Sequence, residues 1–153
     1  QMCIRDRPDA AMDNARSIAA RIVGAMASCG IFSVEMFVSG DDVYFSQVTP
    51  RPSRDGLVTF VTQRINQFDL QARATQRLPI DSTLISPGAV RFLEGHPSQA
   101  ALAAAMAVEE VTVRMLGDGT LVLATADSAA EARQRTDEAV REIHKIDGKP
   151  GEN

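Results

Sequence analysis

The stretch GIFSVEMFVSGDDVYFSQVTPRPSRDGLVT, residues 30–59, is the part of this sequence that decides its fold. Two apolar runs flank a short polar turn, which predicts two antiparallel strands. Glu35 interrupts the first run between Val34 and Met36. A carboxylate buried there is costly unless a cation or a hydrogen-bond donor meets it. An arginine between two prolines follows the second run, and acids beside such a basic, stiffened turn suit a metal held against an anionic substrate.

The length of the turn sets the register of this hairpin. We expect a three-residue loop, residues 40–42, which places Ser39 opposite Val43 and Glu35 opposite Gln47. Because side chains alternate along a strand, one face then carries Glu35, Phe37, Phe45 and Gln47. The other face, toward the core, comprises Val34, Met36, Val38, Tyr44 and Val48. A two-residue loop would instead put Glu35 and Gln47 on opposite faces.

Apolar periodicity predicts the elements of the rest of the chain. Helices are expected over residues 10–28, 58–77, 97–106 and 128–146, a strand over 89–93, and a second hairpin over 111–116 and 121–126 turned by residues 117–119. The helix over 58–77 should turn Phe60, Val61, Ile65, Phe68 and Ala72 toward the core. Ser128, with Glu131 three residues on, predicts a capping box at the start of the last helix.

The order of these elements predicts an α+β fold with a boundary after residue 80. Residues 10–80 are expected to form one domain and residues 81–147 a smaller one, with tails at 1–9 and 148–153. The segment QMCIRDR, residues 1–7, looks like translated adapter sequence, and a natural untethered terminus is the alternative. A chain of 153 residues is about one domain, and no GxGxxG or P-loop motif occurs in it.

Composition is that of an ordinary globular, cytosolic protein. Hydrophobic residues make up 44% and charged residues 24%, and the net charge of −4 gives nucleic-acid binding no electrostatic basis. We find no signal-peptide pattern and no apolar run long enough to span a bilayer. Two cysteines form no disulfide framework, and Cys29 is expected to be a small buried residue at a helix end.

The hairpin of residues 30–59 and the segments that follow it resemble a known family. VEMFVSGDDVYFSQVTPRP followed by GLVT is similar to the C-terminal part of formate-dependent phosphoribosylglycinamide formyltransferase, an ATP-grasp enzyme of purine biosynthesis. The resemblance continues through QFDLQARATQRLPID, SPGAVRFL, VTVRMLG and LVLATADSAAEARQR, so that it covers residues 13–141. Related ATP-grasp ligases carry similar motifs. The implied fold is the C-terminal portion of an ATP-grasp lobe followed by a small α+β domain, and the chain is expected to be a fragment.

The resemblance implies an activity for the parent protein. ATP would activate formate as an acyl phosphate, which the amine of glycinamide ribonucleotide would then attack. Magnesium would bridge the ATP phosphates and offset developing charge. The resemblance also implies a cytoplasmic homodimer whose partners are small molecules. Because the nucleotide lobe is missing, we expect this chain alone to be inactive and to carry no catalytic residue.

Several positions depart from the family pattern. Glu35 matches the first of two magnesium-binding glutamates, but the second position is Gln47, whose amide oxygen supplies no charge. After the PRP motif the family reads His-Asp-Thr-Gly, with the Asp holding the substrate amine. This chain has Arg54 at that Asp, and Asp55 replaces it only if the loop shifts by one residue. The family's Lys and paired Arg that grip the ribonucleotide phosphate are absent at residues 117–120.

These departures predict a diverged paralogue with an altered acceptor site. A non-catalytic ATP-grasp relative that acts in binding or oligomerisation is the alternative. Arg51 is a candidate anion ligand, or a donor to loop carbonyls. Arg73 is a candidate phosphate contact, or a solvated charge.

Other charged residues have simpler interpretations. For Glu35, an ion pair with Arg64 or Arg73 is the alternative to metal binding. His96 and His144 are expected at the surface, away from any metal. The helical series Arg133, Arg135, Glu138, Arg141 and Glu142 is expected to be a solvated face.

Overall fold

A computed structural model describes residues 9–148, so the expected tails at 1–9 and 148–153 lie outside the described residues except for Asp9 and Gly148. The chain divides into two compact units. The first is Gln1–Leu57 with Ile65–Asp81, and the second is Val58–Arg64 with Ser82–Asn153. The mixture of helices and antiparallel sheets confirms the predicted α+β class. None of the described helices is long and apolar enough to cross a membrane.

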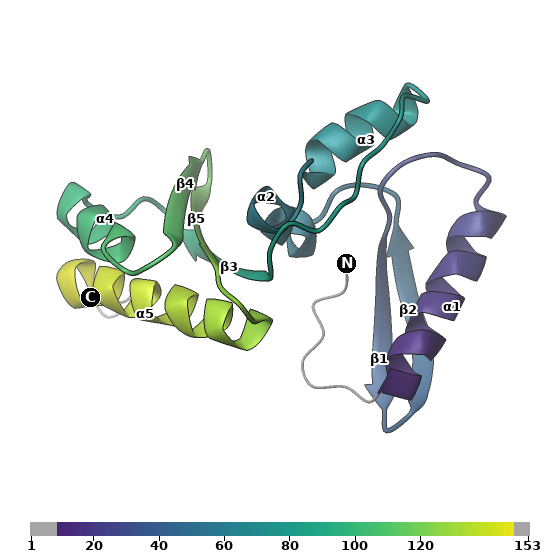
Figure 1. The fold of residues 1–153 in the computed structure, drawn as a ribbon, viewed down its shortest axis with the longest axis horizontal. Coiled ribbons are helices and arrows are strands. Elements are labelled where there is room, and N and C mark those ends of the chain that lie inside the picture. The colour runs from purple at the N-terminus through teal and green to yellow at the C-terminus, as the bar shows by residue number, and fades with distance from the viewer. Residues whose placement is uncertain (1–8, 149–153) are drawn as a thin grey trace. The chain divides into compact units, whose positions relative to one another are not determined.

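The first unit is built on one helix and one hairpin. Helix α1 (Asp9–Ala25) lies along the hairpin of β1 (Ser33–Ser39) and β2 (Asp42–Thr49), as Figure 1 shows. Ala11 and Ala15 are the buried residues of α1, because small side chains let the helix approach the sheet closely. The helix is the one predicted over residues 10–28, although it ends earlier.

The turn of this hairpin differs from the expected one. Ser39 pairs with Asp42, so the loop has two residues and not three. Even so, Glu35 pairs with Gln47, as predicted. The two facts are compatible because Met36 pairs with Phe45, which leaves Ser46 as an extra residue, a β-bulge that restores the pairing.

The bulge also changes which aromatic side chain accompanies Glu35. Phe37 pairs with Tyr44, and both are exposed, at 64% and 57%. Our assignment of Tyr44 to the core face and of Phe45 to the Glu35 face is therefore wrong. The prediction counted Asp42 as part of the loop, whereas the structure has its extra residue at Ser46. Residues 43–45 therefore face the side of the hairpin opposite to the one predicted.

The helix predicted over residues 58–77 is broken. A 3₁₀ turn, η1 (Asp55–Val58), runs into the short helix α2 (Thr59–Thr62), and α3 (Gln67–Thr75) begins separately. Gln63 is extended at φ −126° and ψ 154°, and the side chain of Asn66 accepts hydrogen bonds from the backbone N–H of Phe68 and Asp69. This N-cap starts a new helix with a new orientation. Phe68 is consequently 46% exposed and does not face the core as expected.

The second unit is a three-stranded antiparallel sheet with the strand order β3-β5-β4. Its strands are β3 (Gly88–Glu94), β4 (Val111–Leu116) and β5 (Gly119–Thr125), and its larger helices are α4 (Gln99–Met106) and α5 (Ala129–Asp147). The sequence predicted all five, with small differences at their ends. Figure 1 shows α4 beside α5, with α4 to the left of the strands and α5 below them. A core of small and branched side chains joins them to β5: Ala101, Ala105, Val122, Ala139 and Ile143.

The segment of α2 covers the opposite face of this sheet. A Cβ added at Gly88 of β3 would lie 2.7 Å from Cγ2 of Thr62. The guanidinium of Arg114 on β4 lies 4.9 Å from the ring centroid of Phe60, a cation–π contact. With helices on both faces, residues 119–124 of β5 are buried throughout.

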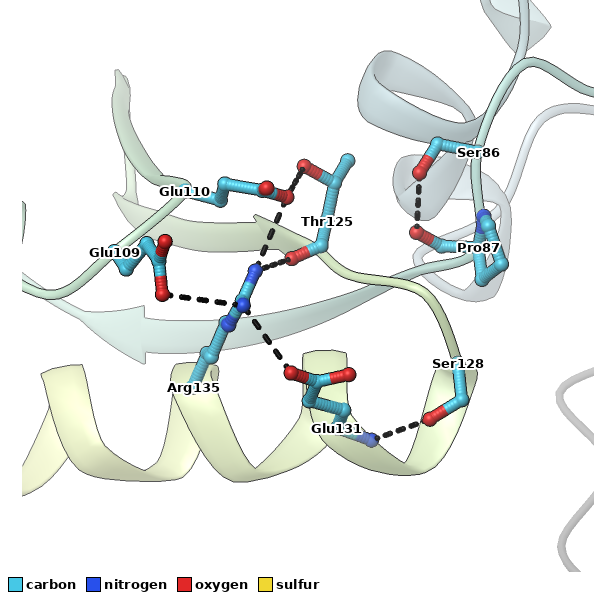
Figure 2. A network of polar contacts seen from close by, with 8 residues as sticks. All are labelled: Ser86, Pro87, Glu109, Glu110, Thr125, Ser128, Glu131 and Arg135. Atoms are coloured by element: carbon cyan, nitrogen blue, oxygen red, sulfur yellow. Dashed lines mark hydrogen bonds and ion pairs between the residues drawn. The ribbon is translucent and has the colours of Figure 1, made fainter.

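Arg135 on α5 makes the densest polar network among the described residues (Figure 2). Its guanidinium donates to the backbone oxygen of Thr125 at 2.8 Å and pairs with Glu109, Glu110 and Glu131 at 3.1–3.3 Å. Its side chain is only 16% exposed, so the prediction of a solvated position is wrong here. Ser128 caps α5 by accepting from the Glu131 N–H, while the Glu131 carboxylate turns to Arg135.

We predict that Gly119→Ala destabilises the second unit by about 3 kcal/mol, because the new Cβ would collide with the backbone oxygen of Leu93 and lie 2.5 Å from Cζ of Phe92. Gly117→Ala, in the same turn, has nothing within 4 Å and serves as the control. Chemical denaturation monitored at β5 amides measures both. Equal midpoints for the two variants would show that the close approach at Gly119 is not limiting.

Arg135→Met should destabilise the same unit by about 1–3 kcal/mol, since it removes the donor to Thr125 and leaves Glu110 and Glu131 without their cation. Arg141→Met removes the same charge from an exposed position of α5 and should change stability by less than about 0.5 kcal/mol. Urea unfolding of both variants, followed at β5, is the measurement. If Arg141→Met lowered the free energy of unfolding as much as Arg135→Met, the contacts of Arg135 would have no specific role in stability.

Candidate functional site

The exposed face of the β1–β2 hairpin brings three polar side chains together. The Glu35 carboxylate accepts a hydrogen bond from Ser46 Oγ at 3.1 Å and another from Gln47 Nε2 at 2.8 Å. Both donors come from the bulge, where two residues of β2 oppose one residue of β1. The bulge thus places Ser46 and Gln47 on the same carboxylate.

Glu35 is exposed, which corrects the expectation of a buried acid in the first strand. Its alternation with Val34 and Met36 turns it away from α1, toward the open side of the sheet. Its two donors lie on the neighbouring strand, and Arg73, one of the cations considered as its partner, donates to the backbone oxygen of Pro79 at 3.5 Å.

The donor set fits a hard divalent cation. Carboxylate, amide and hydroxyl oxygens are the ligands that Mg²⁺ accepts, and it keeps several positions for water or substrate phosphates. Turning the Gln47 amide by half a rotation exchanges Nε2 for Oε1 and presents that oxygen beside Glu35. The site carries a single protein charge. Within residues 9–148, no group of three or more His, Cys, Asp or Glu side chains is arranged to hold a metal.

A loop rich in proline and arginine follows β2. We call residues 50–56 the arginine loop. Arg51 and Arg54 are exposed in it, as is Asp55, the first residue of η1. The loop is folded on itself, because the N–H of Arg51 donates to Thr49 O and the N–H groups of Gly56 and Leu57 donate to the oxygens of Ser53 and Arg54.

Gln67, the first residue of α3, binds the arginine loop through its side-chain amide. It accepts from the Ser53 N–H at 3.2 Å and donates through Nε2 to the Ser53 oxygen at 2.8 Å. The side chain is only 3% exposed, and a Cβ at Gly56 would lie 2.6 Å from its Cδ atom. Four residues along the same helix, Gln71 accepts from the Ile31 N–H at 2.6 Å and ties down the entry to β1.

Of the predicted site residues, Glu35 and Gln47 are brought into direct contact, and Arg51, Arg54 and Asp55 share one loop. Arg73 lies six residues after Gln67, which is about 9 Å further along α3. It is exposed and reaches the oxygen of Pro79. Sequence reasoning missed Ser46 and Gln67. Asn66 followed by Asp69 was the available signal, because an N-cap there starts α3 at Gln67.

The remaining candidates lie away from this group in the chain. His96 is exposed as predicted, His144 is half-buried, and Cys29 is exposed, so the expectation that it is a buried helix-end residue is wrong. Leu116 pairs with Gly119, so the turn predicted over residues 117–119 has only two residues, Gly117 and Asp118.

Comparison with known proteins places the hairpin in a family. The ATP-grasp domain model matches residues 2–68, which include the whole hairpin and the arginine loop. Formate-dependent phosphoribosylglycinamide formyltransferase of Corynebacterium efficiens is 48% identical over 138 residues, a match that covers 82% of this chain and 34% of that protein. The chain therefore spans about a third of the length of the curated relatives it matches.

Solved structures agree. The structure of glycinamide-RNase-transformylase T from Mycobacterium tuberculosis is 42% identical with a TM-score of 0.83, covering 92% of this chain and 43% of that one. N5-carboxyaminoimidazole ribonucleotide synthetase from Thermotoga maritima shares the fold, with 24% identity, a TM-score of 0.76, and coverage of 84% and 40%. The ATP-grasp domain model thus matches the first part of this chain, and the chain is similar over most of its length to formate-dependent phosphoribosylglycinamide formyltransferases.

Proposed function

We propose that this chain is the C-terminal part of an ATP-dependent formyltransferase that supplies one side of the metal site and a loop for anionic substrate groups. The observation that carries the proposal is the contact of Glu35 with Ser46 and Gln47 on an exposed sheet face, directly before the arginine loop. The 48% identity to a formyltransferase, far beyond what a shared fold requires, supports the reaction class.

The reaction proceeds in two steps. A formate oxygen attacks the γ-phosphorus of ATP, ADP leaves, and formyl phosphate forms. The acceptor amine then attacks the formyl carbon, inorganic phosphate leaves, and the nitrogen loses a proton. Both steps move negative charge between oxygens, so electrostatic stabilisation is the main contribution that protein groups make.

The residues of this chain have separate roles in that reaction. Glu35 and Gln47, with Ser46 beside them, would hold Mg²⁺, which neutralises phosphate charge when bound. Arg51 and Arg54 would face anionic groups, because a guanidinium forks well onto phosphate or carboxylate. The resemblance extends the proposal to a cytoplasmic homodimer.

The acceptor of the parent protein is proposed to differ from glycinamide ribonucleotide. Arg54 stands where the family carries an amine-binding Asp, and a guanidinium repels a protonated amine. The two-residue turn Gly117-Asp118 offers an acid where the family's phosphate-binding Lys and Arg residues stand. A non-catalytic relative is the second candidate, because Gln47 removes one charge from the metal site.

In the full-length protein, we predict formate-dependent ADP release, and none from this chain alone, because the nucleotide lobe lies outside it. Glycinamide ribonucleotide should bind at least about a hundredfold more weakly than to the relative from Corynebacterium efficiens, since two lost charge-assisted contacts contribute about 3 kcal/mol or more. Coupled ADP assays and calorimetry measure these quantities. Formate-independent or absent ADP release favours the non-catalytic candidate, and similar affinity of both proteins for glycinamide ribonucleotide refutes the altered acceptor.

Gln47→Glu in the full-length protein should tighten Mg²⁺ binding by about tenfold or more, because a unit charge about 4 Å from a dication contributes about 2 kcal/mol even in water. Gln134→Glu adds the same charge at an exposed position of α5 and is the matched control. Calorimetric Mg²⁺ titration of both variants separates a ligand position from a general charge effect. Unchanged binding in Gln47→Glu would remove residue 47 from the metal site.

A further inference from the structure

We propose that Gln67 is a positioning residue for the arginine loop: its amide sets the loop conformation that presents Arg51 and Arg54 to a phosphate or carboxylate group. This proposal deepens the proposed function and rests on it for the identity of the substrate. It goes further by assigning a role to a buried helix residue that contacts no anion itself.

The geometry at Ser53 carries the argument. A primary amide can both accept and donate, and Gln67 uses both capacities on one residue, at the backbone N–H and the backbone oxygen of Ser53. Such a pair fixes the position and the rotation of that unit together. Ser53 lies two residues after Arg51 and directly before Arg54, so the two guanidinium groups leave the backbone on either side of the held point.

Close packing at Gly56 removes the remaining freedom of the loop. A Cβ at residue 56 would lie 2.6 Å from Cδ of Gln67, so a side chain there would push the amide away from the loop. Pro50 and Pro52 restrict the backbone dihedrals on both sides of Arg51. The loop is therefore held at Ser53, packed at Gly56 and stiffened at its prolines, while its arginines remain exposed.

The start of α3 orients the Gln67 side chain. Asn66 accepts from the N–H groups of Phe68 and Asp69, which fixes the first turn of the helix. Gln67 is then the first helical residue, and its 3% exposure leaves its amide enclosed against the loop. A buried amide with both partners satisfied is costly to rearrange, which suits a residue that must hold a binding loop in one conformation.

The test uses the chain itself, titrated with inorganic phosphate and followed by NMR at the backbone and guanidinium signals of Arg51 and Arg54. We expect one saturable binding curve, and Gln67→Leu should weaken it by about tenfold or more, because displacing a binding group by about 1 Å has large effects. Gln71→Leu is the matched control: it removes a part-buried side-chain hydrogen bond of the same helix, to the Ile31 N–H, and should leave phosphate affinity within about twofold.

Thermal unfolding separates positioning from stability. The melting temperature should fall by a similar amount in both Leu variants, whereas only Gln67→Leu should lose phosphate affinity. Equal phosphate affinity of Gln67→Leu and the unchanged chain, or no phosphate shifts at Arg51 and Arg54 in the unchanged chain, overturns the proposal. If Gln67→Leu does not fold, Gly56→Ala, which pushes the amide away through its Cβ, replaces it with the same expected loss and the same contrary outcome.

The full-length protein distinguishes failure of this proposal from failure of the proposed function. Where formate-dependent ADP release is present, Gln67→Leu should raise the KM for formate, a carboxylate, with a smaller change in kcat. A proportional fall of kcat alone contradicts the positioning role. Where ADP release is absent, the proposed function fails, and the phosphate titration still decides the role of Gln67.

Discussion

The hydrogen bonds of Glu35 to Ser46 and Gln47 depend on one extra residue in β2. A two-residue loop, taken alone, would pair Glu35 with Ser46 and direct Gln47 to the α1 side of the hairpin. The bulge at Ser46 reverses the alternation for the last residues of β2. It therefore allows a tight turn at one end of the hairpin and a polar, oxygen-rich face at the other, where the arginine loop begins.

The break between α2 and α3 has a comparable role for the loop. In a continuous helix from residue 58 to residue 77, Gln67 would lie in the middle of the helix, and no helix start would orient its side chain. The extended Gln63 and the N-cap at Asn66 instead let Val58–Arg64 belong to the second unit while Gln67 begins a helix of the first. The residues on either side of the break thus belong to different units. The arginine loop is bound by Gln67 at the start of α3.

Much of this architecture follows from local sequence. The strands of both hairpins, the cap at Ser128 and the long helix α5 obey apolar periodicity and capping rules, which act within a few residues. The pairing of Glu35 with Gln47 was also correct, although through a different turn. The features that sequence reasoning missed depend on contacts between distant residues. Ser46 carries no local mark of a bulge, and Arg135 contacts Glu109 and Glu110, which reach it from the turn between α4 and β4.

The central claim is that the bulged hairpin face is a cation site, and paramagnetic relaxation by Mn²⁺ tests it most directly. Mn²⁺ accepts the same hard oxygen ligands as Mg²⁺ and broadens NMR signals near the place where it binds. Substoichiometric Mn²⁺ added to this chain should broaden the signals of Glu35, Ser46 and Gln47 first. Broadening that begins at the carboxylates around Arg135, with the hairpin signals unchanged, would contradict the account.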